Sequence, residues 1–280
     1  FNVTYLYKHD ISLNVYTLEI GLLDISKEEV IDELIPIVES YLNESLEVVS
    51  IKDIMHHLGY TSVVLKHQPN FSLQYGIQQY ALEPLYCGDS FSTFHQDNDH
   101  YLALSDGMGQ GKKAASESKL TLEVLSKLIL NGISLKDTVD SVNALLKIKN
   151  HNDMFTTLDL CNINLANAKM KLIKYGANPS YHIRNKMIEK ITTNSLPVGI
   201  VSKLKMSSYE MTLKSDDIII MSSDGTGDNF EKIINDNLDL IDQLHPQEVA
   251  TLLMDKVLED NNLDDISIIV VKVVNAKNDN

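Results

Sequence analysis

The chain has 280 residues, of which 44% are hydrophobic, and its formal net charge at pH 7 is −15. Acidic residues outnumber basic ones by 39 to 24, and Arg184 is the only arginine. Such a chain lacks the basic patches that neutralise nucleic-acid phosphates, so we exclude nucleic acid as a partner. The sequence also contains no apolar run of about 18 residues, the length that a membrane-spanning helix needs.

Two cysteines, Cys87 and Cys161, are too few for a disulfide framework. We therefore expect a reducing, cytoplasmic environment. The chain begins at Phe1 rather than at methionine, which indicates a fragment. A membrane tether upstream of residue 1 in the full-length protein is compatible with this expectation.

Residues 1–70 are expected to form a small α+β unit, either regulatory or a linker segment. The predicted elements are strands at 3–7, 12–20, 46–51 and 61–66 and a helix at 26–45. Ser26 followed three residues later by Glu29 is the pattern of a helix-capping box. The stretch "KHQPN" (66–70) predicts a linker, because proline interrupts regular structure. No chemical motif occurs in this part.

Residues 71–280 are predicted to form a second domain. Weakly alternating strands lead to "YLALSDG", and helices at 112–130 and 134–147 follow. The chain then runs through a series of strands, with hairpin turns at Asn167-Ala168 and Arg184-Asn185-Lys186. Helices at 229–241 and 246–259 and a strand at 266–274 complete it. Strands in meanders with paired helices favour antiparallel sheets covered by helices, which is an α+β class.

The glycines after Asp106 invite comparison with nucleotide-binding loops, and their spacing excludes both common types. A Walker loop needs glycine at position 106, which is aspartate. A dinucleotide fingerprint that starts at Gly107 needs glycine at position 112, which is lysine.

Carboxylates at predicted strand ends point instead to divalent cations. The candidates are Asp89 in "CGDS", Asp106 in "SDGMG", Asp224 in "SSDG", and Asp264 with Asp265 in "LDDIS". Hard cations prefer carboxylate and carbonyl oxygens, and two such ions can clamp a phosphate and activate water. The glycine after each Ser-Asp is expected to let the backbone turn tightly, so that its carbonyl can approach an ion.

The order of these motifs resembles a known family. The stretches are "GDS", "SDGMGQG", "TTLDL", "YGANPSY", "SLPVGI", "MSSDG" and "DDIS". Together they are similar to the metal-dependent serine/threonine protein phosphatases (the PPM family), in the bacterial branch that includes stage II sporulation protein E. The resemblance covers about residues 71–274. It implies a β-sandwich of two antiparallel sheets flanked by helices, with two Mn²⁺ or Mg²⁺ ions and direct attack of a metal-bound hydroxide on phosphorus.

The resemblance also implies roles for individual residues. Asp106 would bridge the two ions and Gly107 would offer its carbonyl, while Asp224 would bind one ion. The family motif selects Asp264 rather than Asp265 as the last ligand. Asp89 matches an early acidic motif and would act on the second ion, directly or through water. The catalytic set is thus Asp106, Asp224 and Asp264, and the metal set adds Asp89 and Gly107.

Further positions are assigned structural roles. Thr157 and Asp159 match a family strand, and their alternation with leucines favours a half-buried strand. Asn178-Pro179-Ser180 is expected to make a turn near the site. Arg184 lies in a predicted hairpin turn, where it would be solvated and unavailable to the substrate phosphate. Phosphate recognition would then depend on metals, waters and helix-end amides.

The resulting hypothesis is a phosphatase that acts on phosphoserine or phosphothreonine of a regulatory protein. By resemblance, the substrate would be a phosphorylated anti-sigma-factor antagonist. A homodimer through the helices at 112–130 and 134–147 is also implied. The alternatives are a regulatory binding module that keeps the fold without turnover and a metal-dependent phosphodiesterase or nuclease, which the acidic composition disfavours.

Overall fold

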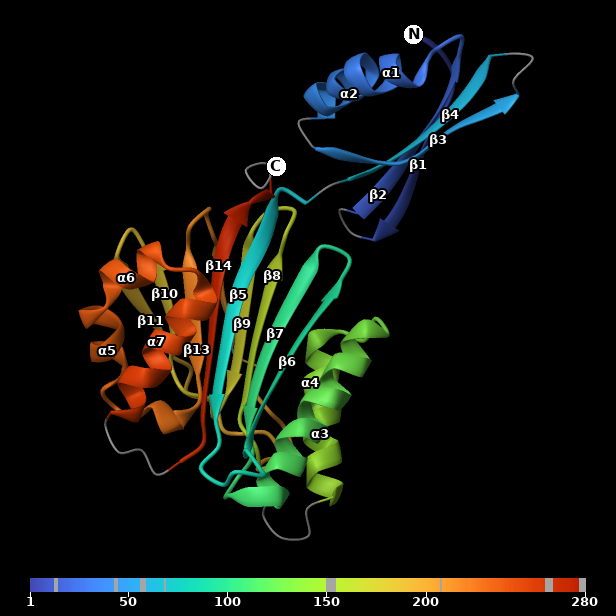
Figure 1. Cartoon of the computed structure of the whole chain (residues 1–280). Helices are drawn as coiled ribbons and strands as arrows, with labels where there is room; N and C mark the ends of the chain where they lie inside the picture. Colours follow the sequence, from blue (N-terminus) through green and yellow to red (C-terminus); the bar gives the residue numbers. More distant parts are fainter. Residues whose placement is uncertain are drawn as a thin grey trace. The chain divides into compact units, whose positions relative to one another are not determined.

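The computed structural model describes residues 1–12, 15–42, 45–55, 59–67, 69–149, 155–206, 208–259 and 264–276. It divides into two compact units (Figure 1). The first consists of Phe1–Phe71, Leu165–Asn167 and Ala276–Asn280, and the second of Ser72–Asn164 and Ala168–Asn275. A regulatory role for residues 1–70 and a phosphatase role for residues 71–280 stay predictions.

The first unit is an antiparallel sheet in the order β1-β2-β4-β3, packed against one helical segment. Its strands are β1 (Asn2–Ser12), β2 (Val15–Leu23), β3 (Leu46–Met55) and β4 (Tyr60–His67). The helical segment runs through α1 (Lys27–Glu29), the π-helical η1 (Val30–Leu34) and α2 (Ile35–Leu42). Its start is the predicted capping box, because the Glu29 amide donates to Ser26 Oγ at 3.2 Å and the Ser26 amide donates to Glu29 Oε2 at 2.8 Å. The predicted linker begins too early, since Lys66 and His67 still belong to β4.

The second unit contains two sheets. One has the order β11-β10-β13-β14-β5 and the other the order β12-β9-β8-β7-β6. The strands are β5 (Phe71–Tyr80), β6 (Asp89–Gln96), β7 (Asp99–Asp106), β8 (Leu158–Asn164), β9 (Lys169–Tyr175), β10 (Ser180–Arg184), β11 (Met187–Ile191), β12 (Ser208–Thr212), β13 (Ile218–Ser222) and β14 (Ile266–Asn275). Both predicted hairpin turns are present, with positive φ at Ala168 (54°), Asn185 (51°) and Lys186 (60°).

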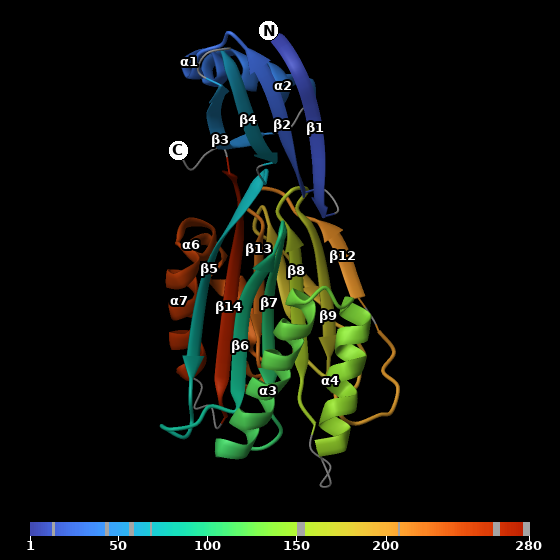
Figure 2. The ribbon, with the colours of Figure 1, turned by 90° about the vertical axis from the view of Figure 1, so that its right-hand side faces the viewer.

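Helices cover the outer faces of both sheets. The helices α3 (Gly111–Leu130) and α4 (Leu135–Lys149) pack on the β6–β9 sheet, with Leu125 and Val142 fully buried (Figure 2). The other sheet is covered by α5 (Phe230–Asp236), α6 (Leu238–Gln243) and α7 (Pro246–Leu258), which bury Phe230 and Leu253 (Figure 1). The predicted class, a β-sandwich of antiparallel sheets flanked by helices, is confirmed.

Two details differ from the prediction. The helix expected at 229–241 is broken at Asn237, which ends α5 and precedes α6. The strand β8 is buried on both faces rather than half-buried, because helices cover one face and the second sheet covers the other. Among the described residues, no helix combines the length and the apolar character needed to cross a membrane.

Candidate metal centre

Strand ends bring the predicted acidic residues to one end of the sandwich. Asp89 begins β6 and Asp106 ends β7, and the two are direct cross-strand partners. In the other sheet, Asp224 follows β13 in a short 3₁₀ turn, and Asp264 lies just before β14. Because β13 and β14 are antiparallel, the end of one lies beside the start of the other.

A cavity of about 550 Å³ opens at this end. Asp106, Gly107, Asp224 and Asp264 all line it, so residues from both sheets face one space. Asp89 does not line this cavity. It borders a neighbouring groove between β6 and α3, where Lys119 and Glu123 also lie.

Burial and neighbouring acidic charges favour the protonated form of three of these carboxyl groups, those of Asp89, Asp106 and Asp224. Burial, together with the charges of Asp89, Asp224 and Asp264, raises the pKa of Asp106 to about 8. Partial desolvation of its carboxyl group raises the pKa of Asp224, with Asp264 as the main charged neighbour, although the residue as a whole is exposed at the surface. In the absence of a cation, this end of the sandwich therefore disfavours full ionisation.

Asp89 is the most buried member of the group, with 3% of its surface exposed. Its pKa is raised to about 7, mainly by burial and also by the charges of Asp265 and Asp224, while the hydroxyls of Ser223 and Ser267 oppose the rise. Neither carboxylate oxygen has a hydrogen-bond partner with good geometry among the described residues. A buried carboxylate without partners is costly unless a cation or water compensates it.

Asp264 and Asp265 differ in what their side chains already bind. Asp265 is buried and accepts hydrogen bonds from the amides of Leu82 (2.8 Å) and Gly88 (2.6 Å), one on each oxygen. Its carboxylate thus anchors the loop that leads into β6. Asp264 lines the cavity instead. This arrangement supports Asp264 as the ligand.

The glycines of the two Ser-Asp-Gly motifs have a packing role that the sequence did not reveal. A Cβ atom on Gly107 would lie 2.2 Å from the carbonyl oxygen of Ala114 in α3. A Cβ atom on Gly225 would lie 2.1 Å from the carbonyl oxygen of Asp265. Each glycine therefore lets another backbone segment approach the aspartate that precedes it. The sequence led us to expect glycine at these positions because of a tight turn. The structure shows instead that glycine is needed because another backbone segment comes close.

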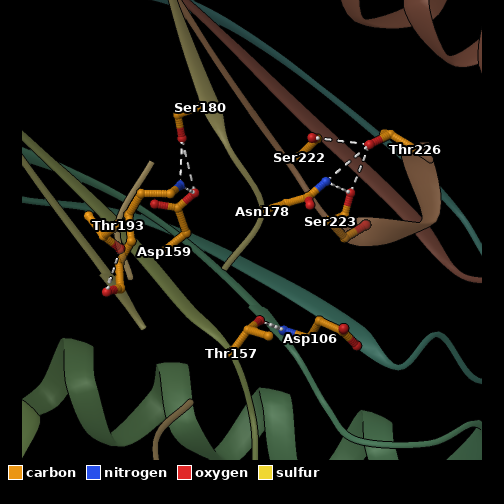
Figure 3. A network of polar contacts seen from close by, with 10 residues as sticks. Asp106, Thr157, Asp159, Asn178, Ser180, Thr193, Ser222, Ser223 and Thr226 are labelled. Atoms are coloured by element: carbon orange, nitrogen blue, oxygen red, sulfur yellow. Dashed lines mark hydrogen bonds and ion pairs between the residues drawn. The ribbon is translucent and has the colours of Figure 1, made fainter. Parts of the chain in front are cut away.

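Two threonines missed as functional candidates fix the backbone of Asp106. Thr157 Oγ1 accepts a hydrogen bond from the Asp106 amide at 2.8 Å (Figure 3). Thr156 Oγ1 donates to the Asp106 carbonyl oxygen at 2.6 Å, and the Thr157 amide donates to the same oxygen at 2.9 Å. The signal available in the sequence was the Thr-Thr pair directly before a strand.

A buried ion pair lies beside this site. Asp159 of β8 pairs with Lys174 of β9, and both side chains are almost completely buried. Lys174 Nζ donates to Ser180 Oγ at 2.7 Å, and that hydroxyl donates to Asp159 at 3.1 Å. Burial raises the pKa of Asp159, while Lys174 and Ser180 lower it. The ion pair and the hydroxyl together form a clamp across β8, β9 and β10.

Arg184 is not the solvated residue that its predicted turn suggested. It ends β10, and its guanidinium donates to both carboxylate oxygens of Asp217, with Nε 2.8 Å from Oδ1. Its side chain is 28% exposed. Since Asp217 engages it, Arg184 is unavailable to the cavity, although for a different reason than expected.

The oxygen donors present suit hard divalent cations. Four carboxylates converge on one end of the sandwich, two with pKa values near neutrality and one with unpartnered oxygens. Within the part of the chain that the structure describes, no three acidic, histidine or cysteine side chains already surround a single point. The carboxylates therefore suit divalent cations by their charge and by the type of their donor atoms, and not because a complete coordination sphere is already formed.

Comparison with known proteins shows the family to which the chain belongs. The model of the family "Stage II sporulation protein E (SpoIIE)" matches residues 96–274. The stage II sporulation protein E of Bacillus subtilis is 29% identical over 282 residues, which cover 93% of this chain and 34% of that protein. The chain thus spans about a third of the length of that relative.

Two solved structures extend the comparison. The phosphatase domain of B. subtilis SpoIIE, with a fragment of its regulatory domain, aligns with a TM-score of 0.78 and 27% identity. That alignment covers 98% of this chain and 83% of the solved one. The catalytic domain of the phosphatase PstP with two manganese ions aligns at 20% identity over 73% of this chain and 100% of that chain, with a TM-score of 0.58. This second likeness shows the fold alone.

The raised pKa values predict a pH-dependent affinity for Mn²⁺. Protons on Asp89 and Asp106 compete with the ion below about pH 7 and pH 8, respectively. Mn²⁺ affinity measured by electron paramagnetic resonance should therefore be at least about tenfold weaker at pH 6 than at pH 8. Equal affinities at pH 6 and pH 8 would contradict the raised pKa values, because carboxylates with ordinary pKa values are already ionised at pH 6.

The clamp predicts a large stability effect. Lys174→Met leaves Asp159 as an unpaired buried charge, and it should lower the free energy of unfolding by about 3–5 kcal/mol in urea titrations. The control is Lys171→Met on the same strand, whose ammonium pairs with Glu210 at the surface and should contribute little. A loss below about 1 kcal/mol for Lys174→Met would show that the pair is not a stabilising contact.

Proposed function

This chain belongs to the stage II sporulation protein E family of protein phosphatases, and from that premise we propose that it hydrolyses phosphoserine or phosphothreonine on a protein, using divalent cations. The observation that carries the proposal is the meeting of Asp106, Asp224 and Asp264 in one cavity. They come from two different sheets, and burial and mutual charge raise the pKa values of Asp106 and Asp224. A binding module without turnover would not need such a costly arrangement.

The carboxylates would hold two Mn²⁺ or Mg²⁺ ions. The charges of both Asp89 and Asp224 act on Asp106, which would therefore contact both ions. Asp224 and Asp264 would hold one ion, and Asp89 would hold the second ion directly or through water. When bound, such ions neutralise phosphate charge and lower the pKa of a water molecule.

The residues around the cavity suggest how the phosphate group is oriented. Gly109 and Gln110 line the cavity immediately before α3 begins at Gly111. The start of a long helix favours an anion through its backbone amides and its dipole. No lysine or arginine is among the described residues that line the cavity. The start of α3 would therefore orient the substrate phosphate, in addition to its attraction by the cations.

For the substrate, we infer a phosphorylated regulatory protein of the anti-sigma-factor antagonist type. The sequence resemblance implies this class, while family membership and the likeness to the SpoIIE phosphatase domain support the coarser conclusion of a protein phosphatase. A phosphorylated antagonist and a small aryl phosphate are the substrates to compare. A protein substrate should be favoured in kcat/KM, since contacts remote from the phosphate add binding energy.

We also propose self-association through the α3–α4 pair. Large apolar side chains remain exposed on it, namely Leu130, Ile133, Leu145 and Ile148. Ile148 is 77% exposed and lies three residues from Leu145 on α4. A second copy of the chain is the occupant that would cover this surface, in agreement with the dimer that the family resemblance implies.

The carboxylates are tested by removing their charge. Asp106→Asn and Asp224→Asn should each lower the rate of phosphate release from a phosphoserine protein by at least about a hundredfold at saturating Mn²⁺. The metal-free variants should remain folded, because the change removes repulsion between neighbouring acids. Asp255→Asn on the exposed face of α7 is the matched control.

Two results would count against the phosphatase proposal. Near-normal activity of either variant would place the chemistry elsewhere. A wild-type chain that Mn²⁺ stabilises against heat, without hydrolysing phosphoproteins or aryl phosphates, would favour the binding module.

The self-association proposal predicts a change in mass. Ile148→Glu should shift the chain toward monomer in analytical ultracentrifugation, because a charge cannot be buried in an apolar contact without cost. Leu240→Glu on α6, which is 44% exposed, is the control and should leave the mass unchanged. A wild-type chain that is monomeric at high concentration would contradict the proposal.

A further inference from the structure

The loop between β9 and β10 passes from one sheet of the sandwich to the other. Gly176 begins it with a positive φ of 60°, and a Cβ atom there would lie 2.3 Å from Cγ of Pro197. The Gly176 amide donates to the Ser195 carbonyl oxygen at 2.9 Å. The path of this loop is therefore fixed at its first residue.

The clamp fixes the loop at both ends. Lys174 precedes it near the end of β9, Ser180 follows it at the start of β10, and Asp159 binds both side chains. All three side chains are buried, so water does not compete for these contacts. Thr193 Oγ1 adds a hydrogen bond to the Lys174 carbonyl oxygen at 3.1 Å. The residues in between are therefore anchored on both sides.

From this loop, Asn178 reaches the turn that carries Asp224. Its Nδ2 donates to the Ser223 carbonyl oxygen at 3.0 Å and lies 3.4 Å from Thr226 Oγ1 (Figure 3). Thr226 Oγ1 in turn donates to the Ser223 carbonyl oxygen at 2.9 Å. The amide thus contacts the turn on both sides of Asp224.

We propose that Asn178 is a positioning residue that sets the Asp224 turn, held in place by the Asp159–Lys174–Ser180 clamp. Asp106 ends β7 in one sheet and Asp224 follows β13 in the other, so their separation depends on contacts that cross between the sheets. Asn178 makes such a contact with Ser223, the residue that directly precedes Asp224. The inference rests on the proposed phosphatase site, because it assigns Asp224 to cation binding there.

The test replaces Asn178 with leucine, which has a similar size and cannot donate a hydrogen bond. In the metal-free protein, amide hydrogen exchange of the 221–229 peptide should become at least about tenfold faster, since this turn opens more easily. The Mn²⁺ affinity measured by electron paramagnetic resonance should fall at least about tenfold. Asn235→Leu on the exposed face of α5 is the matched control and should change neither quantity.

Each measurement decides something separate. Exchange of the 221–229 peptide within about twofold of wild type would overturn the positioning role, and so would unchanged Mn²⁺ affinity in a folded Asn178→Leu variant. A lower melting temperature alone, with both quantities unchanged, would mean that Asn178 only stabilises the fold. If the wild type binds no Mn²⁺, the proposed function fails, and the exchange result still decides whether Asn178 holds the turn.

Discussion

Repulsion between carboxylates is the constraint on which the second unit depends. Asp89, Asp106, Asp224 and Asp264 gather at one end of the sandwich, and burial together with mutual charge raises the pKa values of the first three. The contacts within this cluster are repulsive, so they do not drive its assembly. The surrounding backbone must hold it, and the energy for this comes from the packed sheets and helices.

Different local contacts hold three of the four aspartates. Thr156 and Thr157 bind the backbone of Asp106, and Asn178 contacts the turn of Asp224. The glycine after each of these aspartates admits a neighbouring backbone that any side chain would exclude. Asp265 fixes the loop before Asp89. Hydrogen bonds to backbone groups predominate, which leaves the ligand carboxylates available to cations.

The sequence was informative where local chemistry determines structure. The sequence predicted the α3–α4 helix pair, the capping box predicted the start of α1, and turn residues predicted both hairpins. Strand-end aspartates predicted the acidic cluster, because antiparallel neighbours place strand ends together. The order of motifs then indicated the family and its β-sandwich.

Contacts between distant segments could not be read from the sequence. Asp159 looked like one more residue of an alternating strand, and its burial depends on Lys174, which lies fifteen residues away. Arg184 looked solvated because Asp217, its partner, is 33 residues away. The break at Asn237 also depends on packing, since the helical pattern continues through it. Tertiary contacts decide these cases.

Diffraction at the manganese absorption edge from crystals soaked in Mn²⁺ tests the central claim most directly, because anomalous density locates the ions without reference to activity. Two neighbouring peaks are expected at the cavity, with Asp106 next to both and Asp224 and Asp264 next to one of them. Peaks elsewhere on the chain, or none at the cavity while Mn²⁺ is bound in solution, would contradict it.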